Sequence, residues 1–181
     1  GLVPVGIGGG HDLTLPFVRA VAERTGVMHG IYLDAHLDVR TEEGSGMPFR
    51  RLIEGGDASG LDVIGLDPNV NAREHVEWFR DHGGRIDALT AQGDWPGGPL
   101  FMSIDLDSID ASQAPGVSAR NPSGLSAQAA SAWALAAGRS ERVRCFDIME
   151  LCPPNDESGR TARLAAHLFL SFLRGFTERR A

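Results

Sequence analysis

Three side chains that could bind a metal ion follow one apolar run of this sequence. In "IYLDAHLD", residues 31–38, Asp34, His36 and Asp38 stand at alternate positions directly after three apolar residues. Because side chains alternate between the two faces of an extended chain, these three are expected to project from one face at a strand end. Two carboxylates and an imidazole gathered there are costly to desolvate unless a cation lies among them, which predicts a metal site.

The same pattern recurs in "FMSIDLDSID", residues 101–110, where Asp105 and Asp107 again alternate with apolar neighbours. A further imidazole, His11, follows a run of three glycines in "GGGHD", where the backbone could turn sharply and approach an ion closely. The candidate metal ligands are therefore His11, Asp34, His36, Asp38, Asp105 and Asp107. Two imidazoles and four carboxylates offer too many oxygens for one tetrahedral zinc but suit two divalent ions that prefer oxygen, with Mn²⁺ as the best single choice.

The charge of this set predicts its chemistry. Two divalent cations would balance four ionised carboxylates, so the cluster should bind metal avidly. Two ions a few ångströms apart lower the pKa of a water shared between them and present it as a nucleophile at neutral pH. The reaction class indicated by the residues alone is hydrolysis.

Length and composition limit the remaining possibilities. With 181 residues, 42% of them hydrophobic, the chain can bury the core of one ordinary domain. A net charge of −7 argues against a nucleic-acid or anionic-membrane partner, and no apolar run approaches the ~18–20 residues of a membrane span. Because Cys145 and Cys152 form no C-x-x-C pair and the opening "GLVPVGIGGG" lacks a signal-peptide pattern, we expect a cytoplasmic protein.

Alternating strand and helix patterns predict the elements that position these residues. Strands are expected at 2–7, 29–33, 61–66, 85–89, 100–106 and 143–149, and helices at 13–24, 72–82, 127–138 and 161–177. This order favours a three-layer α/β/α sandwich with a mainly parallel sheet, whose ligand site lies beyond the carboxyl ends of the strands. Glu150, directly after the last strand, joins the candidate site there. The segment 90–99 has no helical pattern, so either a helix is missing or the flanking strands are not joined in the usual way.

Four motifs in this order resemble the ureohydrolase family of arginases, agmatinases and formimidoylglutamases. They are "GGGHD", "DAHLD", "SIDLDSIDASQAPGVSARNPSGLS" (residues 103–126) and "DIMEL" (147–151), and the resemblance covers almost the whole chain. It implies one arginase-like metallohydrolase domain over residues 1–181. Because the family fold has roughly three hundred residues, the chain is expected to lack about the first third and the N-terminal strands.

The resemblance also implies roles for matching residues. One manganese would be held by His11, Asp34, Asp38 and Asp105, and the other by His36, Asp34, Asp105 and Asp107, so that Asp34 and Asp105 bridge the pair. Asp38 would hold the nucleophile by a hydrogen bond and carry its proton to the leaving group. Glu150 would bind the cationic amidine or guanidine of the substrate. A homo-oligomer, either a trimer or a hexamer, is suggested by the same resemblance.

Within the family, three features favour formimidoylglutamase. Gly10 and Asp12 flank His11, "PPNDESGRTARLAA" (153–166) is similar to the end of that subfamily, and "GSGMPFR" (44–50) is similar to its "SGTPFR". In the last motif Ser45 replaces the proton-shuttling histidine of the arginase pattern. Arg50 would suit the carboxylates of a glutamate-derived substrate. The implied reaction converts N-formimidoyl-L-glutamate to L-glutamate and formamide in histidine degradation.

Other interpretations stay open. Within the family, the chain could be an arginase- or agmatinase-type guanidine hydrolase. Two-metal phosphoesterases and nucleases would need basic residues beside the ligands, and only Arg40 and Arg50 qualify. A metal-binding but inactive assembly domain is a third class. Glu150 could be a capping or salt-bridged residue, Arg50 a solvated one, and the remaining histidines, which have no acidic or cysteine partner at ligand spacing, surface or core residues: His29, His75, His82 and His167.

Overall fold

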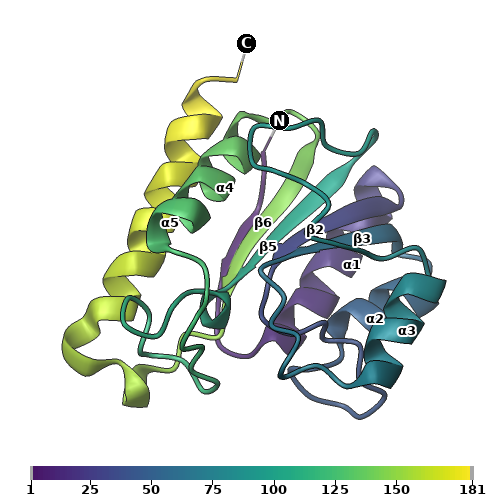
Figure 1. The fold of residues 1–181 in the computed structure, drawn as a ribbon. Coiled ribbons are helices and arrows are strands. Elements are labelled where there is room, and N and C mark those ends of the chain that lie inside the picture. The colour runs from purple at the N-terminus through teal and green to yellow at the C-terminus, as the bar shows by residue number, and fades with distance from the viewer. Residues whose placement is uncertain (1, 180–181) are drawn as a thin grey trace.

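The fold is a six-stranded parallel sheet between two layers of helices, in a computed structural model that describes residues 2–179 (Figure 1). The order of the strands across the sheet is β1-β6-β5-β2-β3-β4, and every neighbouring pair is parallel. The predicted three-layer α/β sandwich is thereby confirmed. The strands are β1 (Val5–Ile7), β2 (Met28–Leu33), β3 (Ala58–Ile64), β4 (Arg85–Ile86), β5 (Leu100–Asp105) and β6 (Val143–Met149).

Helices cover both faces of the sheet, as Figure 1 shows. The first layer holds α1 (Thr14–Thr25), α2 (Pro48–Glu54) and α3 (Arg73–Asp81), and the second holds α4 (Ala127–Arg139) and α5 (Arg160–Thr177). Four of them match the predicted helices to within two residues. The sequence patterns did not predict helix α2. Proline is favoured in the first turn of a helix, and here Phe49 and Leu52, three residues apart, are both fully buried.

Two separate apolar cores lie on either side of the sheet. Alternate residues of β5 point to opposite sides, so that Met102 packs with the α4 and α5 layer while Phe101 packs with the α1 to α3 layer. Helices α4 and α5 approach so closely that a Cβ at Gly138 would lie 2.1 Å from the carbonyl oxygen of Phe172. Only glycine leaves room for that backbone contact.

The connection from β4 to β5 runs through residues 87–99 without a helix. Strand β4 pairs with β3 at one edge, whereas β5 lies between β2 and β6, so the connection passes two strands before the chain re-enters the sheet. Trp95 fills the place of a crossover helix: it is buried, stacks on Trp133 of α4 at 5.6 Å between ring centroids, and donates its indole N–H to the carbonyl of Thr90. The flanking strands are therefore not joined in the usual way.

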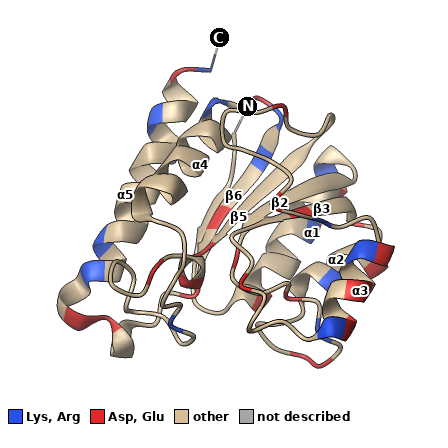
Figure 2. Ribbon diagram, viewed as in Figure 1, with Lys and Arg blue, Asp and Glu red and all other residues tan. Residues whose placement is uncertain are grey.

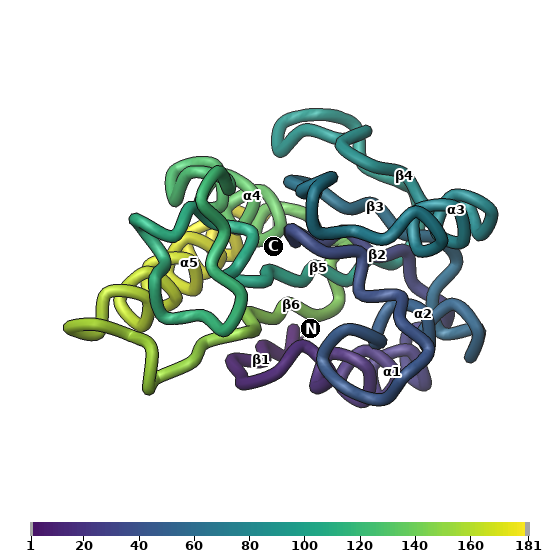
Figure 3. Tube along the Cα trace, turned by 60° about the horizontal axis from the view of Figure 1, so that its bottom comes forward, coloured from purple at the N-terminus to yellow at the C-terminus, as the bar shows by residue number. Residues whose placement is uncertain are grey.

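The carboxyl ends of all six strands point to one edge of the molecule. Figure 3, which brings that edge forward, shows the strands in their order with the helix layers on either side. Because the early strand β1 pairs with the late strand β6, residues far apart in sequence meet there; the Glu150 N–H donates to the carbonyl of Gly9 at 2.7 Å. Acidic positions also gather at this end of the central strands (Figure 2). Among the described residues, no helix is long and apolar enough to cross a membrane.

Candidate metal centre

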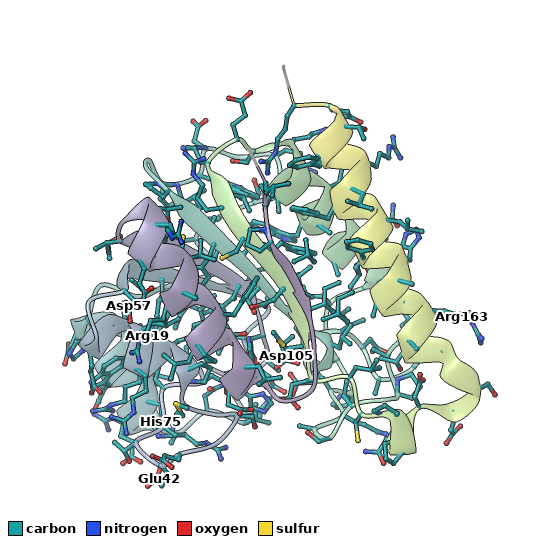
Figure 4. All side chains as sticks on the ribbon, turned by 180° about the vertical axis from the view of Figure 1, so that it is seen from behind. Arg19, Glu42, Asp57, His75, Asp105 and Arg163 are labelled. Atoms are coloured by element: carbon teal, nitrogen blue, oxygen red, sulfur yellow. The ribbon has the colours of Figure 1, made fainter. Side chains whose placement is uncertain are left out.

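The six predicted ligands lie together at the carboxyl edge of the sheet. Asp105, the last residue of β5, is labelled in Figure 4 at the lower end of the strands. His11 begins a short 3₁₀ helix (His11–Leu13) after β1, and Asp107 lies in another (Leu106–Ser108) after β5. The loop that follows β2 supplies the other three, which are Asp34, His36 and Asp38.

Tight turns, rather than an extended strand, bring these side chains to one place. Strand β2 ends at Leu33, as expected, but the chain beyond it turns, so the alternation of an extended chain does not describe how Asp34, His36 and Asp38 project. Instead, the Asp34 carboxylate accepts a hydrogen bond from the backbone N–H of His36 at 2.7 Å. The Asp105 carboxylate accepts one from the backbone N–H of Asp107 at the same distance. Each aspartate thus folds its own chain back, a turn that aspartate favours.

The first group of ligand atoms surrounds the Nδ1 atom of His11. Asp38 Oδ2 and Asp105 Oδ2 each lie 3.1 Å from this nitrogen, and Asp34 Oδ2 lies 3.3 Å from it. One ligand atom from each of the four residues lies within 4.8 Å of every other. This is the set of four that the motif resemblance implied for one metal.

The second group shares Asp34 with the first. His36 Nδ1 lies 3.4 Å from Asp34 Oδ1 and 3.4 Å from Asp107 Oδ2, and these three residues form the second set of convergent atoms. The two oxygens of Asp34 therefore face different groups, as a bridging carboxylate requires. Asp105 converges with the first group but not with the second, so its bridging role stays a prediction.

Burial and crowding perturb the titration of the whole cluster. Burial together with the charge of Asp34 raises the pKa of Asp38 to about 7, and burial with the charges of Asp107 and Asp34 holds the pKa of Asp105 well above its usual value. Hydrogen bonds to Asp107 and Asp34 raise the pKa of His36 to about 11. Without a metal ion, the repulsion within this cluster is relieved only when protons neutralise its carboxylates or charge its imidazoles.

Three buried atoms of the cluster have no hydrogen-bond partner: His11 Nδ1, Asp34 Oδ2 and Asp107 Oδ1. Such orphaned polar atoms are rare in protein interiors and need an explanation. A divalent cation in each group would supply one, because imidazole nitrogen and carboxylate oxygen are the donors that manganese and related ions accept. The residues present therefore fit two divalent ions.

A shallow pocket opens onto the ligands. Its wall is formed by His36, Asp38, Arg40, Ser45, Gly46, Asp105, Asp107, Ser118, Ala119 and Glu150. The Glu150 carboxylate accepts a hydrogen bond from the backbone N–H of His11 at 2.6 Å and a longer one from the Ser118 hydroxyl at 3.4 Å. The predicted substrate residues Ser45 and Glu150 thus line the same pocket as the metal-binding groups.

The family model for the arginase family matches residues 1–174 of this sequence. The chain belongs to the arginase family. The resemblance drawn from the four motifs is confirmed, and with it the fold. Among solved structures, a formiminoglutamase of Trypanosoma cruzi with Mn²⁺ is 34% identical and superposes with a TM-score of 0.91, covering 99% of this chain and 67% of that one.

Curated members of the arginase family with different activities resemble this chain to similar extents. A formimidoylglutamase of Halobacterium salinarum is 33% identical over 195 residues, and a guanidinobutyrase of Pseudomonas aeruginosa is 30% identical over 195 residues. The matches cover 96% of this chain in both cases, but only 62% and 60% of the relatives. The chain thus spans about three fifths of the length of these relatives, and identity alone does not select one substrate.

One predicted residue of this arginase-family chain does not reach the pocket. Arg50 lies on α2, where its guanidinium contacts Glu54 at 2.8 Å and lies over the ring of Trp78 at 4.6 Å. Arg40 lines the pocket instead. Its side chain lies against Gly46, where an added Cβ would come within 2.8 Å of Arg40 Cδ. Helical spacing in "PFRRLIE" was the signal that could have placed Arg50 on α2, facing Glu54 one turn away.

Sequence patterns also missed two buried carboxylates of this arginase-family chain. Asp62 on β3 is fully buried and contacts His29 and Arg85, each at 2.7 Å. Asp147 on β6 is buried behind His11, where it accepts hydrogen bonds from the hydroxyls of Ser103 and Thr14. A lone aspartate inside an apolar strand pattern was the available signal in both cases, since buried carboxylates need partners.

Proposed function

We propose that this protein hydrolyses a linear amidine with two Mn²⁺ ions, and that its substrate is N-formimidoyl-L-glutamate, which yields L-glutamate and formamide in histidine degradation. The observation that carries the proposal is a pocket where two convergent metal-binding groups meet Glu150 and Arg40. A substrate with a cationic amidine at one end and carboxylates at the other matches this distribution of charge.

The ions would be held by the two groups of ligands, with Asp34 shared between them. When bound, two Mn²⁺ ions supply Lewis acidity and lower the pKa of water at the site, so that a nucleophile exists at neutral pH. The four carboxylates balance the charge of the pair. The orphaned Nδ1 of His11 and Oδ2 of Asp34 support this assignment, because each lacks any other partner.

We assign proton transfer to Asp38 and binding of the substrate cation to Glu150. The Asp38 carboxylate would accept a proton of the attacking water and return it to the leaving nitrogen. Glu150, at the pocket wall, would bind the amidine cation through a charge-assisted hydrogen bond. Its contact with the backbone N–H of His11 ties the substrate-binding group to the first metal group.

Arg40 is the residue we propose for the substrate carboxylates, with Ser45 as a hydrogen-bond donor beside it. Both line the pocket, whereas Arg50, expected in this role from the sequence, is engaged by Glu54. A planar guanidinium binds carboxylate with two parallel hydrogen bonds. The formiminoglutamase of T. cruzi, with Mn²⁺ and a TM-score of 0.91, supports the same substrate class.

A guanidino acid is the second candidate substrate. The guanidinobutyrase relative favours it, because a guanidino acid also combines a cation with a carboxylate. Agmatine and arginine fit less well: agmatine offers Arg40 no carboxylate, and Ser45 stands where the arginase pattern has a histidine. From the resemblance and the two free cysteines we further propose a cytoplasmic homo-oligomer, a trimer or a hexamer.

The decisive experiment measures product release from N-formimidoyl-L-glutamate, 4-guanidinobutyrate, arginine and agmatine, with added Mn²⁺ and in a chelator control. We expect metal-dependent formamide release from the first compound alone. The variant Arg40→Gln should raise KM for that substrate about tenfold or more with little change in kcat, since it removes ground-state binding. Arg50→Gln is the matched control and should leave KM unchanged. Binding of two metals without turnover of any compound would instead favour an inactive metal-binding domain.

A further inference from the structure

A chain of buried polar groups lies behind His11, on the side of the ring away from the other ligands. His11 Nε2 lies 2.9 Å from the hydroxyl oxygen of Ser103, which donates to Asp147 Oδ1 at 2.5 Å. Asp147 Oδ2 accepts a second hydrogen bond, from the Thr14 hydroxyl at 2.9 Å. All four residues are at most 1% exposed. The proposed reaction assigns no role to Ser103 or Asp147.

The available hydrogens determine which group donates in each of these buried hydrogen bonds. A hydroxyl has one hydrogen, and that of Ser103 is donated to Asp147, so the Ser103 oxygen can only accept from His11. The Nε2 atom of His11 must therefore carry a hydrogen. In a neutral imidazole the lone pair then lies on Nδ1, the atom that faces three carboxylates at 3.1 to 3.3 Å. A lone pair among carboxylates is repulsive unless a cation lies between them.

The sheet itself places Ser103 and Asp147 side by side. Ser103 on β5 pairs in register with Asp147 on β6, and Gly6 on β1 pairs with Asp147 from the other side. A Cβ at Gly6 would lie 3.3 Å from Asp147 Cβ, so the absence of a side chain makes room for the carboxylate. A buried carboxylate with two hydroxyl donors contributes less stability than an apolar side chain of similar size. The arrangement therefore points to a function.

We propose that Ser103 and Asp147 are positioning residues that hold His11 with its hydrogen on Nε2 and leave Nδ1 free to bind a divalent cation. The inference rests on the metal site of the proposed function. Hydrogen bonds of this kind orient a metal-binding imidazole and increase its basicity. Phe49 fixes the same ring from its edge, at 5.0 Å between centroids and 89° between planes. The Thr14 hydroxyl donates to Asp147 rather than to the His11 ring, so Thr14 serves as the control.

The test compares Ser103→Ala and Asp147→Asn with Thr14→Val. Mn²⁺ affinity at each of the two positions is measured by competition with a chelator, without reference to turnover. We expect the position that contains His11 to weaken about 10- to 100-fold in the first two variants, and the position that contains His36 to change much less. Thr14→Val should lower the urea midpoint but leave both affinities close to those of the wild type. Ser103→Thr, which keeps the hydroxyl, should restore affinity.

A spectroscopic readout tests the hydrogen itself. In protein loaded with diamagnetic Cd²⁺, ¹⁵N spectra should show His11 protonated at Nε2, with slow exchange of that hydrogen in the wild type and faster exchange in Ser103→Ala. A hydrogen on Nδ1 in the loaded wild type, or unchanged affinity in both variants, would overturn the proposal. So would an equal loss of affinity in Thr14→Val, because that result assigns a general structural role. A wild type that binds two metals but hydrolyses no amidine contradicts the proposed substrate alone.

Discussion

Asp38 and Glu150 line one pocket from two different loops, and both have a left-handed backbone, with φ of 50° and 66°. This conformation costs a residue with a side chain about 1–2 kcal/mol, and aspartate tolerates it better than glutamate. Backbone hydrogen bonds hold both in place: the Glu150 N–H donates to Gly9, and the Asp38 carbonyl accepts from Phe49. Strain at two of the proposed site residues is typical of positions whose geometry serves function.

The variant Asp38→Asn should stabilise the metal-free protein while it weakens metal binding. The substitution removes a carboxylate whose pKa burial and Asp34 raise to about 7, and asparagine also tolerates a positive φ. We expect the unfolding free energy at pH 8 with EDTA to rise by about 1–2 kcal/mol, measured by urea denaturation. Lower stability than the wild type would contradict the view that the empty cluster repels itself.

Asp34→Asn should lower the occupancy of both metal positions, because its two oxygens face different groups. The comparison is His36→Ala, which removes a ligand from one group only. After dialysis against limiting Mn²⁺, elemental analysis should find close to one ion per chain in His36→Ala and less than one in Asp34→Asn. Two ions in Asp34→Asn would rule out the bridging assignment.

Stability without metal should fall as the pH rises from 6.0 to 8.5. Hydrogen bonds to Asp107 and Asp34 raise the pKa of His36 from 6.5 to about 11, so the folded state keeps a proton that the unfolded state releases above pH 6.5. Asp38 acts in the same direction below pH 7, because its folded pKa is also raised. Urea midpoints in EDTA should therefore decrease across this window, with a shallower slope in His36→Gln.

Added Mn²⁺ should reverse that slope, because metal binding displaces the protons and becomes more favourable as pH rises. The control is the same titration with Mg²⁺, which dehydrates reluctantly and is expected to bind these imidazole-containing groups weakly. Parallel slopes with and without Mn²⁺ would show that the protons of His36 and Asp38 are not displaced by metal.

Gly138→Ala should destabilise the protein by about 2–3 kcal/mol. The added methyl would meet the backbone oxygen of Phe172 at 2.1 Å, and a backbone atom of a packed helix cannot move away as a flexible side chain can. Gly97→Ala, where the added carbon has no neighbour within 4 Å, is the matched control. The measurement is the urea midpoint of each variant, provided that the m-value is unchanged. Equal midpoints for Gly138→Ala and Gly97→Ala would contradict the prediction.

The sequence predicted which side chains converge at the edge of the sheet better than it predicted the loops that bring them together. His11, Asp34 and Asp105 are identified by residue type next to apolar strands, and parallel strands bring their carboxyl ends to one edge whatever the loops do. The loops themselves depend on local hydrogen bonds, such as that from His36 to Asp34, which an alternating pattern does not encode. For this reason the extended-chain argument selected residues that do converge but assumed the wrong backbone conformation for them.

Residues that act through tertiary neighbours were harder to predict. Arg40 and Arg50 are the same residue type, yet an ion pair with Glu54 one helical turn away draws Arg50 from the pocket. Ser103 and Asp147 are 44 positions apart and meet only because β5 pairs with β6 in one register. The register of β5 on β6, and therefore the distance between Ser103 and Asp147, cannot be obtained from one sequence without knowing the order of the strands.

The pairing of β1 with β6 governs how the protein folds. His11 and Glu150, joined by a hydrogen bond, are 139 positions apart in the sequence. Strand β5 must also enter the sheet between β2 and β6. Such non-local contacts make folding slow, because the chain loses the entropy of closing long loops before the contacts contribute any favourable free energy. A nascent chain that has emerged only as far as β4 carries His11, Asp34, His36 and Asp38 but lacks Asp105 and Asp107, so neither group of ligands is complete. A cation held by the full set of ligands therefore stabilises the completed topology.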